Sequence, residues 1–318
     1  MITFRHIVVL FSLCLPAMGH AQAPGVPVYS EGADVHPDAE IQMQCRVLKN
    51  KGELMDFKKL DEQMGRKTCA LKLPKVGTTK LARRELWQRA RKSHLRVGWL
   101  DKGADDKEFK VELSGGYAIT NDTVVTCGHV IGHDEDLVEG YLIAVDDDNK
   151  VYPVMEVLAV NLATDCAILR LKTDQLTPLP LSTDVVPGDR VCCFSDPVDR
   201  RGFFAEGIVN RFIKRRFLRD EEIPESDRND PARIESPVWM CVTDDWAQGS
   251  SGSAVMDDCG NAVGHVSEIQ PVMEEAIDPE DTTAAAKLKA ETEPRGTVIV
   301  FHEAIVAQNV LALIRPQP

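Results

Sequence analysis

From residue 95 onward the chain is a series of short β-rich runs separated by turn residues, with almost no helical pattern between them. Many short strands at such spacing favour an all-β barrel or sandwich. Two polar inserts, at 219–236 and 271–296, interrupt the pattern and are predicted to be exposed loops. The predicted strands cover residues 95–100, 111–120, 124–127, 141–145, 154–160, 166–171, 190–194, 203–213, 238–243, 253–256, 262–267 and 297–301.

Helices are expected only at the two edges of this β-rich region. Thr79 is predicted to cap a helix over residues 80–92, whose apolar side chains fall on one stripe. At the other edge, residues 303–314 repeat apolar side chains at helical spacing, which predicts an amphipathic C-terminal helix that docks on the β-rich region.

The first 23 residues have the three-part pattern of an export signal. A short basic start is followed by an apolar run over residues 7–17, which is too short to span a bilayer as a stable helix. Ala21-Gln22-Ala23 then supplies the small-x-small cleavage site. We therefore expect a secreted or periplasmic product, with no membrane insertion after the signal is removed.

The charge of the chain limits its partners. Asp and Glu number 50 against 37 Lys and Arg, which gives a formal net charge of −13. Such a surface repels phosphate backbones, so nucleic acid is not an expected partner.

Eight cysteines follow the signal, and an oxidising compartment permits disulfides. Cys45 and Cys69 flank one polar segment of the extension at 24–79 and are candidates for a disulfide. Cys127, Cys166 and Cys241 lie in apolar strand-like runs, where buried free thiols are expected. No CxxC pair or cysteine–histidine cluster has ligand spacing, so neither a metal site nor a cofactor is predicted.

Three separate segments carry residues suited to acyl transfer. Residues 124–129 (VVTCGH) lead from a β-branched strand into His129, and histidine is the side chain that titrates near neutrality. Asp165 stands at the start of the hydrophobic run 166–171, where a carboxylate can orient an imidazole. Taken singly, each has a simpler explanation, a structural histidine or a turn carboxylate.

The third segment, residues 248–255 (QGSSGSAV), is a turn of small residues between two predicted strands. A nucleophilic serine needs such a turn, so that its hydroxyl projects while backbone N–H groups converge on the developing oxyanion. Gly249 permits the backbone geometry, and the N–H groups of Gly249 and Ser251 are the predicted oxyanion hole. A Gly/Ser loop without chemistry is the alternative.

The blocks TNDTVVTCGHV, DCAIL and GSSGSAV, followed by GNAVGHVS, resemble the signature blocks of trypsin-like serine peptidases, most closely the bacterial branch with HtrA-type and glutamyl-endopeptidase-type enzymes. The resemblance covers about residues 80 to 315. It implies two six-stranded antiparallel β-barrels, with His129 as general base, Asp165 as orienting acid and Ser251 as nucleophile. Ser267 matches the serine that supports the acid in many relatives.

Two departures from the family pattern limit what the resemblance implies. Ser250 stands where animal digestive enzymes carry the aspartate that receives a new N-terminus, so activation by terminal insertion is not expected. Too few residues follow Ser251 for the remaining strands plus a PDZ domain, so peptide-triggered regulation of the HtrA kind is not expected either.

The substrate pocket is less constrained by the sequence. Asp245 lies six residues before Ser251, a position that lines the base of the primary pocket in trypsin-type enzymes and would favour Lys or Arg. A surface or hydrogen-bonded turn acid beside Asp244 is the competing interpretation. Ser267 is a second candidate pocket residue, while the strand phase of His265 does not match the pocket histidine of glutamyl endopeptidases.

The sequence thus predicts an exported serine endopeptidase that acts on proteins or peptides. The predicted segments are a signal at 1–23, an extension at 24–79, a helix with the first barrel at 80–178, and the second barrel with a C-terminal helix at 179–318. An α/β-hydrolase is excluded, because its order Ser…Asp…His and its G-x-S-x-G motif are both missing. A catalytically inactive binding module and an extension that acts as a propeptide remain as alternatives.

Overall fold

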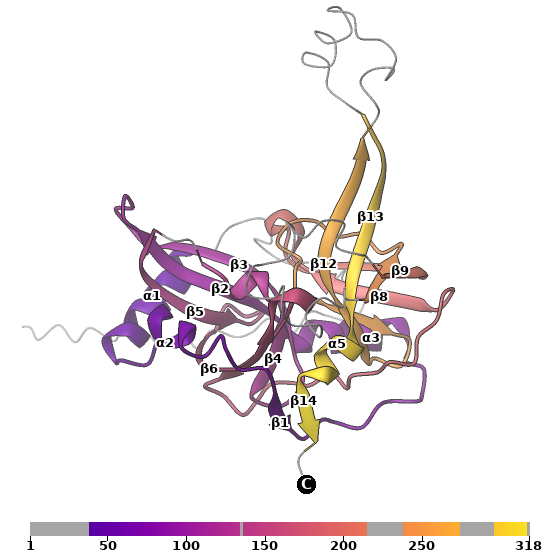
Figure 1. Cartoon of the computed structure of the whole chain (residues 1–318), viewed down its shortest axis with the longest axis horizontal. Helices are drawn as coiled ribbons and strands as arrows, with labels where there is room; N and C mark the ends of the chain where they lie inside the picture. The colour runs from indigo at the N-terminus through magenta and orange to yellow at the C-terminus, as the bar shows by residue number, and fades with distance from the viewer. Residues whose placement is uncertain (1–37, 134–135, 215–237, 274–295, 317–318) are drawn as a thin grey trace, which may run out of the picture. The chain divides into compact units, whose positions relative to one another are not determined.

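The computed structural model of the chain describes residues 38–133, 136–214, 238–273 and 296–316. Its strands close into two six-stranded antiparallel barrels, as the sequence predicted (Figure 1). The predicted signal, the insert at 219–236 and most of the insert at 271–296 lie outside the described residues. No described helix is long and apolar enough to cross a membrane.

The first barrel has the strand order β2-β3-β4-β7-β6-β5. The two faces of its strands alternate as a closed barrel requires. In β4, for example, Val124 packs into the barrel interior, whereas Val125 packs between the barrels. The strands are β2 (His94–Gly103), β3 (Lys110–Ala118), β4 (Thr123–Thr126), β5 (Leu137–Val145), β6 (Val151–Asn161) and β7 (Cys166–Leu171).

The second barrel has the order β10-β13-β12-β11-β8-β9. Its last two strands pair beyond the barrel, from Gly264 opposite Val306 out to Met273 opposite Thr297, and form a long two-stranded ribbon (Figure 1). The strands are β8 (Arg190–Ser195), β9 (Phe203–Lys214), β10 (Val238–Val242), β11 (Ala254–Asp257), β12 (Ala262–Met273) and β13 (Thr297–Val306).

A shared apolar core joins the two barrels. Tyr117 and Ile168 of the first barrel belong to the same buried cluster as Met256 and Ile305 of the second. Fully burying such side chains stabilises the fold by roughly 1.5–3 kcal/mol each. The end of β4, the start of β7 and the β11–β12 region border this core, and they carry the residues that the sequence singled out.

The predicted edge helices are shorter than expected. The first, α3, spans Arg83–Ser93 and begins after Ala82 rather than at Thr79, because Lys80 and Leu81 bond to Asp258 of the second barrel. The second, α5, spans only Ala307–Ala312, because residues 303–306 continue β13 and pair with β12 and β10. The apolar side chains at the start of the predicted helix therefore belong to a barrel strand and not to one face of a helix.

The N-terminal extension is built into the first barrel, which the sequence did not predict. Helix α1 (Asp38–Asn50) buries Ile41 and Cys45 against the outside of that barrel, and α2 (Phe57–Asp61) adds Phe57 and Leu60 to its interior cluster. The proposed Cys45–Cys69 disulfide is wrong: both thiols are free, and Cys45 is fully buried among apolar side chains.

The three cysteines of the predicted strand-like runs, Cys127, Cys166 and Cys241, are buried free thiols, as predicted. Two short strands, β1 (Cys69–Leu71) and β14 (Ile314–Pro316), pair in parallel and tie the extension to the C-terminal end of the described chain.

The packing of α1 predicts the effect of truncating its buried side chain. Ile41→Ala should lower the free energy of unfolding by about 2–4 kcal/mol, because Ile41 is fully buried. Met43 lies on the same helix with 62% of its surface exposed, so Met43→Ala should change stability by less than about 0.5 kcal/mol. Urea unfolding of both variants measures the difference, and equal stabilities would show that α1 does not contribute to the barrel.

Candidate active site

His129 stands at the point where the first barrel opens toward the second. The buried strand β4 ends at Thr126, and His129 begins the short 3-10 turn η1 (His129–Ile131). Val130 and Ile131 are buried beneath this turn, while the His129 side chain is 53% exposed. The strand and the turn therefore hold the backbone and leave the imidazole accessible.

Asp165 lies beside His129, although 36 residues separate them in the chain. It ends the turn η2 (Leu162–Thr164) in a left-handed conformation with φ 49°, just before β7 begins. Both carboxylate oxygens lie 3.0 Å from His129 Nδ1, and Oδ1 also accepts the backbone N–H of His129 at 3.0 Å. Two separate groups of His129 thus fix the carboxylate, which orients the ring.

Residues of β12 in the second barrel complete the surroundings of Asp165. Ser267 Oγ donates to Asp165 Oδ2 at 2.5 Å. His265 is fully buried, and its Nε2 lies 3.0 Å from the backbone carbonyl of Asp165. Burial lowers the pKa of His265, so the ring is neutral near pH 7 and its N–H donates to that carbonyl. Sequence reasoning missed this role of His265, because only the barrel contact reveals it.

The protonation states follow from these contacts. Burial by itself raises the pKa of Asp165, but the hydrogen bonds from His129 and Ser267 outweigh it and hold the pKa well below its ordinary value of 3.8. The hydrogen bond to Asp165 raises the pKa of His129 above its ordinary value of 6.5, although burial acts in the opposite direction. Asp165 is therefore charged near neutral pH and stabilises protonated His129.

The turn that carries Ser251 is docked against both barrels. The backbone carbonyl of Ser251 accepts from Gly115 N of β3 at 2.7 Å, and Gly252 N donates to Val266 O of β12 at 2.7 Å. A Cβ at Gly252 would clash with the Gly115 carbonyl and the Thr126 side chain. The Gly115-Gly116 pair inside a predicted strand was the sequence signal for this close approach of two backbones.

One carbonyl links the Ser251 turn to the other two segments. Val266 O accepts from Gly252 N at 2.7 Å and from Cys127 Sγ at 3.0 Å. Gly252 follows Ser251, Cys127 precedes His129 by two residues, and Ser267, next to Val266, bonds to Asp165. The three predicted catalytic residues therefore come from segments that are joined at two adjacent residues of β12, Val266 and Ser267.

The predicted oxyanion hole has its donors available. Gly249 adopts φ 92°, which favours glycine, and a Cβ there would lie 2.9 Å from Asp196 O. Among the described residues, none accepts a hydrogen bond from the backbone N–H of Gly249 or of Ser251. Two unpaired N–H groups beside a candidate nucleophile are what oxyanion stabilisation requires.

The neighbouring acids Asp244 and Asp245 have opposite environments. Asp245, the predicted pocket residue, has 77% of its side chain exposed, and its Oδ1 lies 3.3 Å from His302 Nε2. Asp244 is fully buried, and no described residue donates to either of its carboxylate oxygens. Burial raises the pKa of Asp244 to about 8, so this side chain is mostly protonated at neutral pH. A preference for Lys or Arg stays a prediction.

Cys127, His129 and Asp165 are the one group of described residues whose ligand atoms lie within 4.8 Å of one another and so suggest a metal site. Their chemistry does not fit a metal. Burial raises the pKa of Cys127 well above its ordinary value of 9.0, which keeps the thiol protonated, and its S–H donates to Val266 O. The Nδ1 atom of His129 is already bonded to Asp165.

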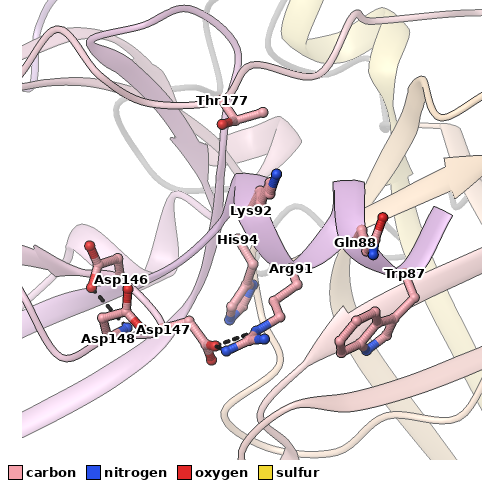
Figure 2. Close-up of a pocket in the computed structure, with 9 residues that line it drawn as sticks. All are labelled: Trp87, Gln88, Arg91, Lys92, His94, Asp146, Asp147, Asp148 and Thr177. Atoms are coloured by element: carbon pink, nitrogen blue, oxygen red, sulfur yellow. Dashed lines mark hydrogen bonds and ion pairs between the residues drawn. The ribbon is translucent and has the colours of Figure 1, made fainter. Parts of the chain in front are cut away.

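A cavity of about 560 Å³ lies elsewhere, where α3 meets the β5–β6 turn. Trp87, Arg91 and Lys92 of α3 line one side and Asp146–Asp148 the other, with His94 between them (Figure 2). Arg91 is paired with Asp147 at 2.5 Å. None of the three predicted catalytic residues lines this cavity.

Comparison with known families agrees with the fold and the motifs. The family model described as "Trypsin-like peptidase domain" matches residues 114–264, a span that contains His129, Asp165 and Ser251. Residues 114–264 therefore match a trypsin-like peptidase domain, and the chain has the trypsin-like serine peptidase fold. This match supports the interpretation that the chain is a serine protease, a class of enzyme whose substrates are proteins or peptides. No curated protein sequence matches the chain.

Solved structures resemble the peptidase domain in fold. The active form of the Rv3671c protease from M. tuberculosis is 17% identical, with 76% of this chain and 88% of that chain covered and a TM-score of 0.51. The serine endoprotease from Yersinia pestis is also 17% identical, with 74% and 65% covered and a TM-score of 0.45. At 17% identity the similarity to the Rv3671c protease concerns the fold alone.

The raised pKa of His129 predicts how activity of the peptidase domain depends on pH. If His129 is the general base, it must be neutral to act, so kcat/KM should fall as the pH falls through a value above 6.5. A pH–rate profile measures this limb. Ser267→Ala removes one hydrogen bond to Asp165 and should lower kcat/KM across the profile. If activity of the unmodified protein falls only well below pH 6, the His129–Asp165 contact does not raise the pKa of His129.

The buried carboxyl group of Asp244 predicts that the stability of the fold decreases as the pH rises. Its folded-state pKa of about 8 exceeds the ordinary 3.8, so the folded state binds the proton more tightly and stability falls as the pH rises between about 4 and 8. Asp244→Asn should therefore raise the free energy of unfolding by about 5 kcal/mol more at pH 8 than at pH 4, since each unit of pKa shift corresponds to about 1.4 kcal/mol. Thermal melts at both pH values test this, with Asp245→Asn as the exposed control.

Proposed function

We propose that this chain is an exported serine endopeptidase that hydrolyses proteins or peptides through an acyl-enzyme. Ser251 is the nucleophile, His129 the general base, Asp165 the orienting acid, and the N–H groups of Gly249 and Ser251 form the oxyanion hole. The observation that carries the proposal is the Asp165 carboxylate, which binds His129 Nδ1 on one side and Ser267 of the other barrel on the other.

The proposed reaction begins with the imidazole. Because Nδ1–H donates to Asp165, the lone pair of His129 is on Nε2, where it accepts the proton of Ser251. Ser251 Oγ attacks the peptide carbonyl, and the Ser251 and Gly249 N–H groups receive the negative oxygen. His129 then protonates the leaving amine, and a water molecule repeats the sequence on the acyl-enzyme. No metal or cofactor enters these steps.

A catalytically inactive binding module is the second candidate. One observation favours it: among the described residues, no hydrogen bond joins His129 Nε2 to Ser251 Oγ. Such contacts are often long in unliganded enzymes and shorten when substrate binds, so the distance alone does not favour inactivity. Reactivity of Ser251 distinguishes the two candidates.

Export and partners follow from the sequence rather than from the fold. The signal pattern at 1–23 supports a secreted or periplasmic enzyme, and the net charge of −13 supports the exclusion of nucleic acid. Cleavage profiling on a peptide library, with all residue types at the position before the scissile bond, tests the role of Asp245 in selecting Lys or Arg.

The decisive variant is Ser251→Ala. We expect it to abolish both casein hydrolysis and labelling by a fluorophosphonate, because only an activated serine reacts with that probe. The melting temperature should change little, since Ser251 is only partly buried and the loss of its hydroxyl leaves the backbone contacts of the turn in place.

Ser253→Ala is the matched control, because Ser253 lies two residues away in the same turn and its Oγ has no described partner. It should retain labelling. Labelling that persists in Ser251→Ala, or hydrolysis that does not change, would refute the assignment of the nucleophile. Absence of labelling in the unmodified protein would favour the binding module.

A further inference from the structure

One segment of the second barrel packs directly behind the Ser251 turn. Residues 196–202 connect β8 to β9 and include the short 3-10 turn η3 (Pro197–Asp199). Val198 N donates to Gln248 O at 2.6 Å, and Asp196 O lies against Gly249, within 2.9 Å of a Cβ placed there. This segment therefore touches both residues that share the Gln248–Gly249 peptide unit.

The contact from Val198 sets the direction of the Gly249 N–H. A peptide unit is planar and trans, so its carbonyl and its N–H point in opposite directions. Because the Gln248 carbonyl points toward Val198, the Gly249 N–H must point away from the segment at 196–202. This is the same N–H group that has no described acceptor and that the proposed function places in the oxyanion hole.

The supporting segment is itself strained. Val198 and Asp199 have φ values of 43° and 61°, which are left-handed conformations that non-glycine residues rarely adopt. Such conformations persist only where surrounding contacts hold them. Something must therefore fix both ends of the segment.

Asp196 supplies that fixation through its side chain. Its Oδ1 accepts from Gly202 N at 2.7 Å, which closes the segment on itself, and its Oδ2 lies 3.2 Å from His94 Nε2 and 4.0 Å from Arg96 Nε. Asp196, His94 and Arg96 are all buried residues, each with less than a tenth of its surface exposed. Burial by itself raises the pKa of Asp196, but His94, Gly202 and Arg96 outweigh it and lower the pKa, so the buried carboxylate is ionised.

The turn at Ser251 has no ionic anchor of its own. Residues 248–253 contain no ionisable side chain, and the hydroxyl of buried Ser250 lies 3.1 Å from the Ser195 hydroxyl. On the far side, Arg201 bonds to the Asp147 carbonyl at 2.8 Å, and Asp147 lines the cavity beside His94 (Figure 2). Charged contacts to the first barrel thus hold the segment that supports the turn.

We propose that Asp196, held by His94 and Arg96 of β2, is a positioning residue that keeps the Gly249 N–H in the oxyanion hole. The proposal rests on the proposed function, because it assigns a role to that N–H in acyl transfer. Loss of the carboxylate releases the strained segment, removes the Val198–Gln248 hydrogen bond and lets the Gln248–Gly249 peptide rotate. His129, Asp165 and the Ser251 hydroxyl keep their own contacts.

The test uses the full chain and a fluorophosphonate, whose phosphoryl oxygen occupies the oxyanion hole during reaction with the serine. Asp196→Asn should lower the second-order rate constant of labelling by about 10- to 100-fold, part of the loss expected when an oxyanion donor is removed. The pH at which labelling is half-maximal should stay the same, because His129 and Asp165 are untouched. His94→Gln should show a smaller loss in the same direction.

Asp257→Asn is the matched control in the same barrel. Asp257 accepts hydrogen bonds from the backbone N–H groups of Cys259 and Asn261, but it does not touch residues 196–202 or the Ser251 turn. It should lower the melting temperature and leave the labelling rate within about twofold.

The possible outcomes separate this inference from the proposed function. If the unmodified protein is not labelled at all, the proposed function fails. If it is labelled and Asp196→Asn and His94→Gln react at the same rate, only the role of Asp196 is overturned. Equal losses in Asp196→Asn and Asp257→Asn, or a shifted pH midpoint in Asp196→Asn, would show general destabilisation and would also overturn it.

Discussion

The Asp165 carboxylate is a largely buried charge at the junction of two barrels, with 16% of the side chain exposed, and its hydrogen bonds determine how the surrounding segments meet. A buried carboxylate is costly unless donors satisfy it. Here His129 supplies two donors from the first barrel and Ser267 supplies one from the second. Relative movement of the barrels would remove the Ser267 hydrogen bond from this charge. The same contacts that stabilise the charge therefore also hold the imidazole in the orientation that the proposed reaction requires.

The backbone completes what the side chains begin. The Val266 carbonyl joins the Ser251 turn to the strand before His129, and the Gln248 carbonyl joins the same turn to Val198. Both contacts require close approach, which is why glycine occurs at 115, 249 and 252. Backbone hydrogen bonds of this kind orient N–H groups without charged side chains inside the turn. The charged contacts lie behind the turn instead, where Asp196 contacts His94 and Arg96.

The extension before α3 is packed against the first barrel and is part of the fold. Its composition suggested a polar segment with a disulfide, yet Ile41, Cys45, Phe57 and Leu60 are buried against the first barrel. A segment with this much buried apolar surface is part of the folded unit. This packing does not support an extension that is released as a propeptide. Asp61 also lies 3.0 Å from His133, four residues after His129, which connects the extension to the turn that carries the imidazole.

Strand spacing in the sequence predicted an all-β barrel or sandwich, and the resemblance to trypsin-like peptidases implied the two barrels that the structure has and singled out His129, Asp165 and Ser251, because strand spacing and short motifs are local properties of the chain. It did not separate Asp244 from Asp245, because neighbouring carboxylates differ only in which side of a strand end they face. It also mistook residues 303–306 for helix, because β-branched residues that pair across a barrel can share helical spacing. The roles of His265, Val266 and Asp196 were decided by tertiary structure, since each depends on contacts between segments far apart in the chain.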